Sequence, residues 1–131
     1  MSSELKYIED TLAEKYPSIE TSKYIWQELI RKQAIGVGWH ELIIYLMQEI
    51  EKAYEKNNLS ILEFRIDEIK EKYGILRISA YSSLMEVHKI IMETENKSES
   101  TCEKCGKKGK IRINRHWILT LCDSCNDADK G

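Results

Sequence analysis

Cys102-Glu103-Lys104-Cys105 and Cys122-Asp123-Ser124-Cys125 are two cysteine pairs, separated by sixteen residues, in a chain of 131 residues. Two residues between paired cysteines let a tight turn direct both sulfurs at one ion, and two such pairs complete a tetrahedral shell. We therefore predict one structural Zn²⁺ ion bound by Cys102, Cys105, Cys122 and Cys125. Because four sulfur ligands leave no open position, the ion is not expected to take part in catalysis. Unrelated buried thiols or a redox pair are the alternative interpretation.

The residues around the cysteines predict a compact finger over 99–131. Lys110–Ile113 and Trp117–Leu121 are expected to pair as a hairpin, and Asp123 to cap a short final helix. A knuckle, a hairpin and then a cysteine pair at a helix start resemble a treble-clef or zinc-ribbon finger. We expect this finger to dock on the preceding part of the chain, with Trp117 packed at the contact.

Residues 1–98 are predicted to form an α+β body. Apolar residues recur at helical spacing, and after Asn58 the period changes from 3.6 to 2, as expected of strands. The predicted elements are helices at about 4–16, 20–34, 39–56 and 83–97, and a β-hairpin at about 61–81.

Local signals predict how these elements begin and end. Pro17 is expected to stop the first helix. Gly36-Val37-Gly38 should end the second, because glycine adopts the left-handed geometry of a helix terminus. Ser83-Leu84-Met85-Glu86 fits a capping box at the start of the fourth helix. Trp26 and Trp39 lie on apolar helical faces and are predicted to be core residues.

Composition favours a folded protein of the cytoplasm. The longest apolar run, Leu42–Met47, is far shorter than a membrane span, and the first residues do not resemble a signal peptide. Four cysteines in a reducing compartment indicate metal ligands before disulfides. The sequence therefore predicts that no membrane is involved as a partner, and no small-molecule substrate is evident.

Charge is distributed unevenly along the chain. Residues 1–98 hold 13 Lys and Arg against 17 Asp and Glu, whereas residues 99–131 hold 7 against 5. The basic cluster between the cysteine pairs suggests a nucleic-acid patch. However, four thiolates and one Zn²⁺ carry a charge of about −2, which would cancel the local surplus.

No convincing catalytic set emerges, so the protein is not predicted to be an enzyme. His40-Glu41 lacks the second histidine of a zinc protease, and Gly36-Val37-Gly38 lacks the rest of a phosphate-binding loop. His116, in the predicted zinc hairpin, is the one residue that a treble-clef nuclease would use as a base, but no acidic or amide partners recur around it. His88 is expected to be a packing or surface residue.

Two groups of residues form candidate partner-binding surfaces. The turn between the predicted strands places Tyr73 among basic residues that suit a phosphate or an acidic protein surface. The alternative is a solvated hairpin tip. The candidate residues are Lys70, Lys72, Tyr73 and Arg77 in this turn, and Lys107, Lys108, Arg112 and Arg115 in the finger.

The stretch from Ile69 to Arg77, Ile-Lys-Glu-Lys-Tyr-Gly-Ile-Leu-Arg, and the cysteine pairs that follow resemble a group of short uncharacterised proteins encoded by phages and prophages. The resemblance spans roughly residues 36–126. The group usually has a second glycine where this chain has Ile75. The resemblance implies a phage context. It also implies a compact accessory protein that modulates a host protein in the host cytoplasm.

Two function hypotheses follow, with a nuclease as the third. In the first, the protein is an interaction module or inhibitor that binds a protein through the hairpin tip and finger. In the second, the finger binds nucleic acid, with Trp117 as a stacking residue and the basic cluster on phosphates.

Overall fold

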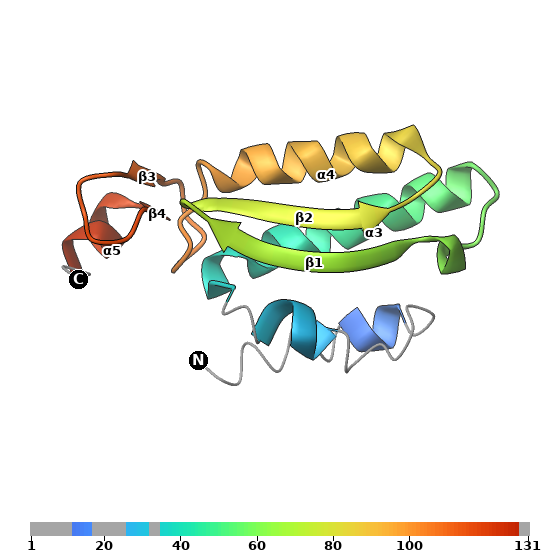
Figure 1. The fold of residues 1–131 in the computed structure, drawn as a ribbon, viewed down its shortest axis with the longest axis horizontal. Coiled ribbons are helices and arrows are strands. Elements are labelled where there is room, and N and C mark those ends of the chain that lie inside the picture. Colours follow the sequence, from blue (N-terminus) through green and yellow to red (C-terminus); the bar gives the residue numbers. More distant parts are fainter. Residues whose placement is uncertain (1–11, 17–25, 32–34, 129–131) are drawn as a thin grey trace.

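The computed structural model describes residues 12–16, 26–31 and 35–128, and it has the predicted α+β architecture (Figure 1). Among these residues, no helix is both long and apolar enough to cross a lipid bilayer. The helical elements are η1 (Gln27–Arg31), η2 (Val37–Trp39), α3 (His40–Lys56), η3 (Ile61–Glu63), α4 (Met85–Ser98) and α5 (Asp123–Ala128). The strands are β1 (Arg65–Lys72), β2 (Ile75–Tyr81), β3 (Lys110–Arg112) and β4 (Leu119–Leu121).

The two long helices lie close to their predicted positions. The helix expected over 39–56 is α3, and the helix expected over 83–97 is α4. The apolar residues of α3 recur three or four positions apart, so they form one buried face, as predicted. Its buried residues are His40, Ile43, Leu46, Met47, Ile50, Ala53 and Tyr54.

The two predicted N-terminal helices are described only in part. Of 4–16, residues 12–15 are helical, whereas 4–11 and Pro17 lie outside the described residues. Of 20–34, the described part contains η1, which is a π-helical turn and not an α-helix. The last residues of the predicted finger, 129–131, also lie outside the described residues.

Strands β1 and β2 pair as an antiparallel hairpin, with Lys72 opposite Ile75 at the turn and Arg65 opposite Tyr81 at the open end. The register shifts between Ile66 and Glu68, which marks a β-bulge. Because of the bulge, the buried positions change from a spacing of two to a spacing of three, so Ile69 is buried after Ile66. The predicted alternation therefore holds for only part of the first strand.

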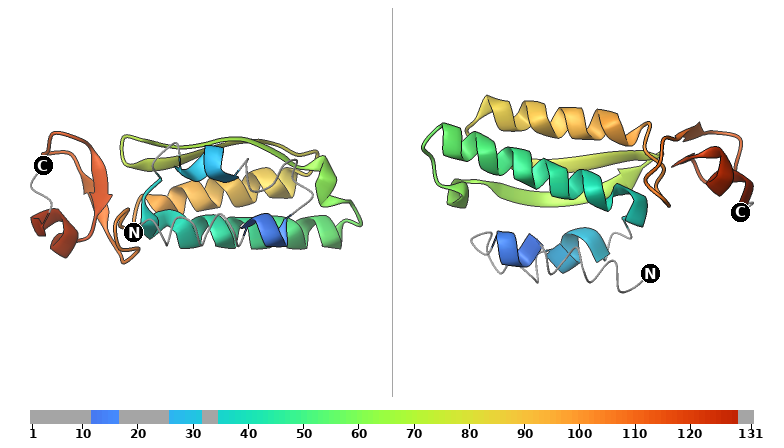
Figure 2. Two further views of the ribbon diagram at one scale, coloured as in Figure 1. Left: turned by 90° about the horizontal axis from the view of Figure 1, so that it is seen from below. Right: turned by 180° about the vertical axis from the view of Figure 1, so that it is seen from behind.

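The helices cover one side of this hairpin (Figure 2). Helix α4 runs along β2, and its side chains pair with backbone groups at the outer edge of that strand. The N–H of Leu76 donates to Ser98 Oγ at 2.9 Å, and the N–H of Ile78 donates to Glu95 Oε2 at 2.9 Å. The unpaired N–H and C=O groups of an open strand edge would attract other chains. Side chains of α4 accept these two N–H groups of β2.

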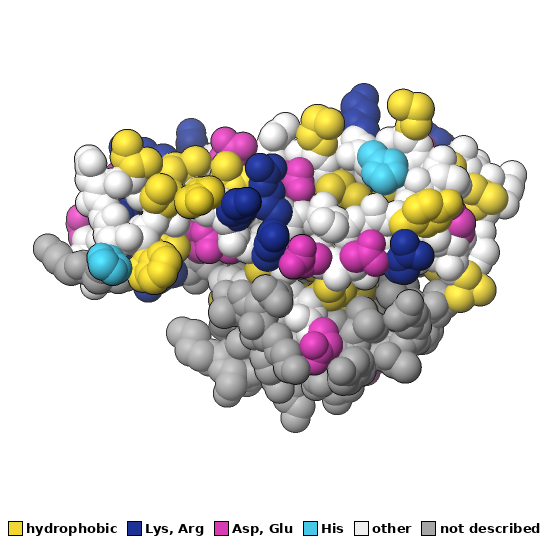
Figure 3. All heavy atoms as spheres, in the orientation of Figure 1, with side chains coloured by type: hydrophobic (Ala, Val, Ile, Leu, Met, Phe, Trp, Pro, Cys, Tyr) yellow, Lys and Arg dark blue, Asp and Glu magenta, His cyan; other side chains and the backbone are white. Residues whose placement is uncertain are grey.

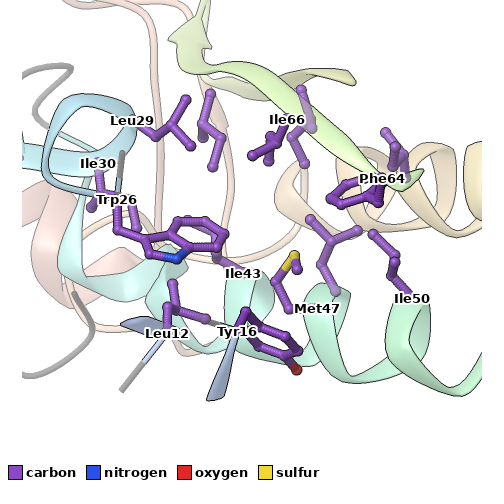
Figure 4. Packing of buried hydrophobic residues seen from close by; sticks show 14 of the residues in the cluster. Leu12, Tyr16, Trp26, Leu29, Ile30, Ile43, Met47, Ile50, Phe64 and Ile66 are labelled. Carbon is purple, nitrogen blue, oxygen red and sulfur yellow. The ribbon is translucent and has the colours of Figure 1, made fainter. Parts of the chain in front are cut away.

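The core lies between the hairpin, α3 and the N-terminal segments. Trp26 and Tyr16 lie against Ile43 and Met47 of α3 (Figure 4). Trp26 and Trp39 have no exposed surface, which confirms their prediction as core residues. Each such aromatic side chain removes a large apolar area from water, so these two residues contribute strongly to stability.

Two predictions about the ends of helices are wrong. The fourth helix does not begin with a capping box at Ser83, because Leu84 is its N-cap residue and makes no side-chain cap hydrogen bond. Instead Ser82 Oγ accepts the N–H of Leu84 at 3.1 Å. Gly36 and Gly38 do not supply left-handed backbone, since neither has a positive φ. Their role is close approach to the finger, described below.

A polar network closes the end of the body away from the finger. The hydroxyl of Tyr54 contacts both Glu63 and Ser82, and Glu63 Oε2 accepts the N–H of Ser83 at 2.8 Å. His88 Nε2 donates to the carbonyl oxygen of Ser82 at 2.9 Å. The hydrogen bond from Tyr54 lowers the pKa of Glu63, so this carboxylate stays charged in the folded state.

We predict that Tyr54→Phe lowers the free energy of unfolding by about 1–3 kcal/mol, because Glu63 and Ser82 lose a buried partner. Urea denaturation measures the change. The folded pKa of Glu63 lies below its unfolded value, so the loss is complete above the unfolded pKa and shrinks as the pH falls through the folded pKa. Tyr45→Phe, at a side chain that is 44% exposed, is the matched control and should change stability little. A pH-independent difference between wild type and Tyr54→Phe would contradict this account.

Candidate metal centre

The ligand atoms of the four cysteines gather at one point. All four Sγ atoms lie within 4.8 Å of one another, so the cluster can hold a metal ion. The Sγ atoms of Cys105 and Cys122 are 3.6 Å apart. Two sulfurs bound tetrahedrally to zinc at about 2.3 Å lie about 3.8 Å apart, so this spacing fits a shared ion. Among the described residues, no second group of histidine, cysteine or acidic side chains is arranged in this way.

The surroundings of the sulfurs favour a thiolate at Cys102 and oppose one at Cys125. Burial opposes ionisation of Cys102, but backbone N–H groups of Cys122, Cys105 and Lys104 outweigh it and lower the pKa of this thiol to about 6. The pKa of Cys125 rises to about 12 because of the neighbouring sulfurs of Cys122 and Cys102, together with burial. Four thiolates therefore cannot all be charged at neutral pH unless a cation offsets their repulsion. A divalent metal ion would supply that charge.

The first cysteine pair lies on a tight knuckle. Gly106 closes it with a φ of 81°, a conformation that side-chain-bearing residues rarely adopt. The N–H of Gly106 donates to the carbonyl oxygen of Cys102 at 2.9 Å, and the N–H of Cys102 donates to that of Lys107 at 2.7 Å. These hydrogen bonds hold the backbone of Cys102 and Cys105 so that both sulfurs lie in the four-cysteine cluster.

The second pair lies where β4 passes into α5. Strands β3 and β4 form the predicted hairpin, with Lys110 opposite Leu121, and α5 begins at Asp123 between Cys122 and Cys125. Within α5, the N–H of Cys125 donates to Cys122 Sγ at 3.4 Å. The helix start therefore helps to orient this pair.

Two of the predicted partner-binding arginines stabilise the finger itself. Arg112 donates to the carbonyl oxygen of Leu121 at 3.0 and 3.1 Å and to Asp123 Oδ1 at 2.7 Å, and its side chain is only 15% exposed. Arg115 donates to Asn126 Oδ1 at 2.9 Å. Both side chains join the β3 half of the finger to α5.

Glu103, between the first two cysteines, joins the finger to the body. Its N–H donates to the carbonyl oxygen of Thr120 at 2.9 Å, and its Oε2 accepts the N–H of Thr120 at 2.8 Å. Its own carbonyl oxygen accepts the N–H of Gly38 at 2.7 Å. Burial, together with the charges of Glu71 and Cys102, raises the pKa of Glu103 to about 7. No local signal in the sequence shows that a charged side chain between two cysteines is buried, so the role of Glu103 was not predicted.

Two further hydrogen bonds connect the finger to the body. Trp39 Nε1 donates to the carbonyl oxygen of Thr101 at 2.8 Å, and Thr120 Oγ1 donates to that of Gly74 at 2.6 Å. The finger therefore contacts the start of α3 and the β1–β2 turn (Figure 1). Trp117 does not pack at this contact, because it is 71% exposed, so that prediction is wrong.

The glycines before α3 permit the close contact. A Cβ atom on Gly38 would lie 2.0 Å from the carbonyl oxygen of Cys102, and one on Gly36 would lie 2.3 Å from that of Glu103. The clashing atoms belong to the backbone, which cannot move aside without displacing the knuckle. These two positions therefore require glycine because of the finger.

The β1–β2 turn places an aromatic residue in an unfavourable conformation. Tyr73 has a φ of 55° and Gly74 a φ of 81°, as in a type I′ turn, where Asn-Gly is preferred. Glu71 Oε2 accepts the N–H of Gly74 at 2.6 Å. Gly74 is buried under the finger, whereas the side chain of its neighbour Tyr73 is 67% exposed. The turn thus holds Tyr73 outward at some cost in backbone energy.

The other predicted partner-binding residues lie near this junction or on the knuckle. Lys70 and Arg77 face each other across the hairpin, and Lys70 Nζ lies 3.6 Å from Glu68. Lys72 Nζ lies 6.0 Å from the centre of the Tyr73 ring. Lys107 and Lys108 are exposed after the first knuckle.

The finger also exposes apolar residues that were not predicted to form part of a site. Ile113 is 69% exposed, and Ile111 and Ile118 are half-buried. Figure 3 shows hydrophobic side chains gathered over the finger, beside Lys and Arg side chains where the finger meets the body. An alternating apolar pattern in a short strand was the available signal, but it does not tell an exposed face from a buried one.

The histidines have local roles. His40 Nε2 donates to the carbonyl oxygen of Ile35 at 3.3 Å, and His88 belongs to the network around Ser82. The exposed ring of His116 meets the Trp117 ring edge-on, with 5.8 Å between centroids.

Comparison with protein-family models, with curated proteins and with solved structures finds no match to this chain. The resemblance to phage and prophage proteins stays a prediction from sequence.

We predict that Gly38→Ala lowers the free energy of unfolding by about 1–3 kcal/mol and weakens metal binding, because the added methyl group displaces the Cys102 backbone. Chemical denaturation and competition with a chromogenic chelator measure the two effects. Val37→Ala alters the same segment without adding a clash, so it should leave metal affinity unchanged. Equal effects of both variants would contradict the proposed contact.

We also predict that Tyr73→Asn raises the free energy of unfolding by about 0.5–1 kcal/mol, since asparagine tolerates positive φ better than tyrosine. Thermal and urea unfolding measure the gain. Tyr81→Asn is the matched control, because Tyr81 is an exposed tyrosine of the same hairpin that lacks a positive φ. A loss of stability in Tyr73→Asn would show that the ring makes stabilising contacts.

Proposed function

We propose that this protein is a small accessory protein that binds a partner protein through its finger and hairpin tip. We further propose that one structural Zn²⁺ ion holds the finger in its folded form. Four sulfur ligands in a tetrahedral arrangement are typical of zinc, with iron as the main competitor. The order of knuckle, hairpin and cysteine pair at a helix start supports a treble-clef or zinc-ribbon type of finger.

The observation that carries the binding proposal is the outward exposure of large apolar side chains at one end of the molecule. Tyr73, Ile113 and Trp117 are each about two-thirds exposed or more. Apolar side chains that gather on the surface of a small protein mark interaction sites more often than isolated ones do. Because the finger and the hairpin turn are hydrogen-bonded to each other, the metal centre supports this end of the protein.

The sequence resemblance extends the proposal to a partner class. If the chain shares the context of the phage and prophage proteins, its partner is a host protein and its compartment is the host cytoplasm. A reducing compartment also suits a centre of four thiolates, which oxidation would convert to disulfides.

Nucleic acid is the second candidate partner, and two observations favour it. Trp117 offers an exposed ring for base stacking, and Lys107 and Lys108 make no ion pair with a described residue. Against it, Arg112 and Arg115 of the same basic cluster are engaged within the finger. Binding that stays constant between low and moderate salt would exclude this candidate, because phosphate contacts require a steep salt dependence. Among the described residues, no side chain around His116 favours the third candidate, a nuclease.

We predict that the purified, reduced protein contains one zinc ion per chain and that zinc-loaded protein captures a partner protein from cell lysate in stoichiometric amount. Elemental mass spectrometry and quantitative pull-down measure these results. The partner should be lost with chelator-treated protein and with Cys122→Ser, and retained by Ser124→Ala, which lies between two ligands but supplies none. Iron in place of zinc would overturn the metal assignment. If Cys122→Ser captures the partner as well as wild type does, partner binding does not depend on the metal-held finger.

A further inference from the structure

Within the surface just proposed, we infer a docking site for an acidic, apolar segment of a protein, formed by Tyr73 and Lys72 at the hairpin tip together with Ile111, Ile113 and Ile118 of the finger. This inference rests on the proposed function, because it specifies the chemistry of that partner.

The apolar residues share one face of the finger. Ile111 pairs with Thr120, so their side chains lie on the same face of the two-stranded sheet. Ile113 and Ile118 lie one residue beyond the ends of β3 and β4 and two residues from Ile111 and Thr120, so continuing the strand alternation by one step brings them to that face. The hydroxyl of Thr120 reaches the carbonyl oxygen of Gly74 at 2.6 Å, so this face borders the hairpin tip that carries Tyr73.

The positive charges beside this face remain available to a partner, whereas the acidic groups nearby are engaged. Glu71 accepts a backbone N–H, Asp123 pairs with Arg112, and Glu103 is buried. By contrast, Lys72, Arg77, Lys107 and Lys108 are exposed and make no ion pair with a described residue. Figure 3 shows Lys and Arg side chains next to the hydrophobic ones where the finger meets the body, with Asp and Glu side chains beside them. The site is therefore complementary to negative charge at its rim and to apolar groups at its centre.

The backbone of Tyr73 is a second, independent indication. A tyrosine at positive φ is uncommon, and asparagine or glycine would serve the turn better. Its ring makes no buried contact that would explain its presence, because the side chain is 67% exposed. Backbone strain of this kind clusters at functional sites. Tyrosine is also one of the residue types enriched among the anchors of protein interfaces.

A protein segment fits this site better than nucleic acid does. Single-stranded nucleic acid binds by stacking successive bases on aromatic rings, whereas Tyr73 is the one aromatic ring of this site and the other apolar groups are isoleucine side chains, which offer no stacking surface.

Selection of a random-peptide display library against the full-length, zinc-loaded protein tests the inference. The enriched peptides should combine Asp or Glu with aromatic or aliphatic residues. In fluorescence anisotropy, Tyr73→Asn, Ile113→Ser and Lys72→Glu should each weaken an enriched peptide by about tenfold or more. Met85→Ser and Lys89→Glu, at exposed residues of α4 away from the finger, are matched controls and should leave affinity unchanged.

Zinc content and unfolding temperature verify that each variant is folded, and Tyr73→Asn is chosen because it should not weaken the turn. The inference is overturned if no peptide is enriched, or if enriched peptides bind Tyr73→Asn and Ile113→Ser as they bind wild type. The enriched peptides could instead be apolar and lack acidic residues, with binding that is lost in Ile113→Ser. That result would overturn the acidic character of the partner and leave the proposed binding function standing. Salt-sensitive binding of oligothymidine that is lost in Trp117→Ala would overturn both.

Discussion

The arrangement of this protein depends on the hydrogen bonds of Glu103. This residue lies between two candidate metal ligands, and it pairs with Thr120 through both its N–H and its side chain. Its carbonyl oxygen accepts the N–H of Gly38. One residue therefore connects the metal centre, the finger hairpin and the start of α3. Because its surroundings are buried, each of these hydrogen bonds is costly to leave unmade.

This connection explains why a metal ion bound by the four cysteines would matter beyond the finger. A structural metal ion contributes folding energy to the segment that holds it, and the candidate segment in this chain also contacts Gly74 in the β1–β2 turn. The turn in turn presents Tyr73 beside the apolar face of the finger. The proposed docking site is thus composed of two parts that are distant in sequence, and the hydrogen bonds around Thr120 bring them together.

Much of the fold follows from patterns that repeat along the chain. The apolar spacing of α3, the change of period at the hairpin and the paired cysteines each reflect a local geometry, so they could be predicted. The predictions that failed concerned residues whose role depends on a distant neighbour. Gly36 and Gly38 were expected to end a helix, but they make room for the knuckle. Trp117 was expected to be buried, but backbone groups and Trp39 make that contact.

The sequence by itself therefore determined the α+β class, the main helices and the four candidate ligands, because periodicity and the spacing of cysteines act over a few residues. Only the tertiary structure decided that Glu103 is buried, that Arg112 and Arg115 serve the finger, and that Tyr73 and Ile113 face outward. These properties depend on which surfaces meet when the finger folds against the body. Local spacing carries no information about that contact, since its atoms come from segments far apart in the chain.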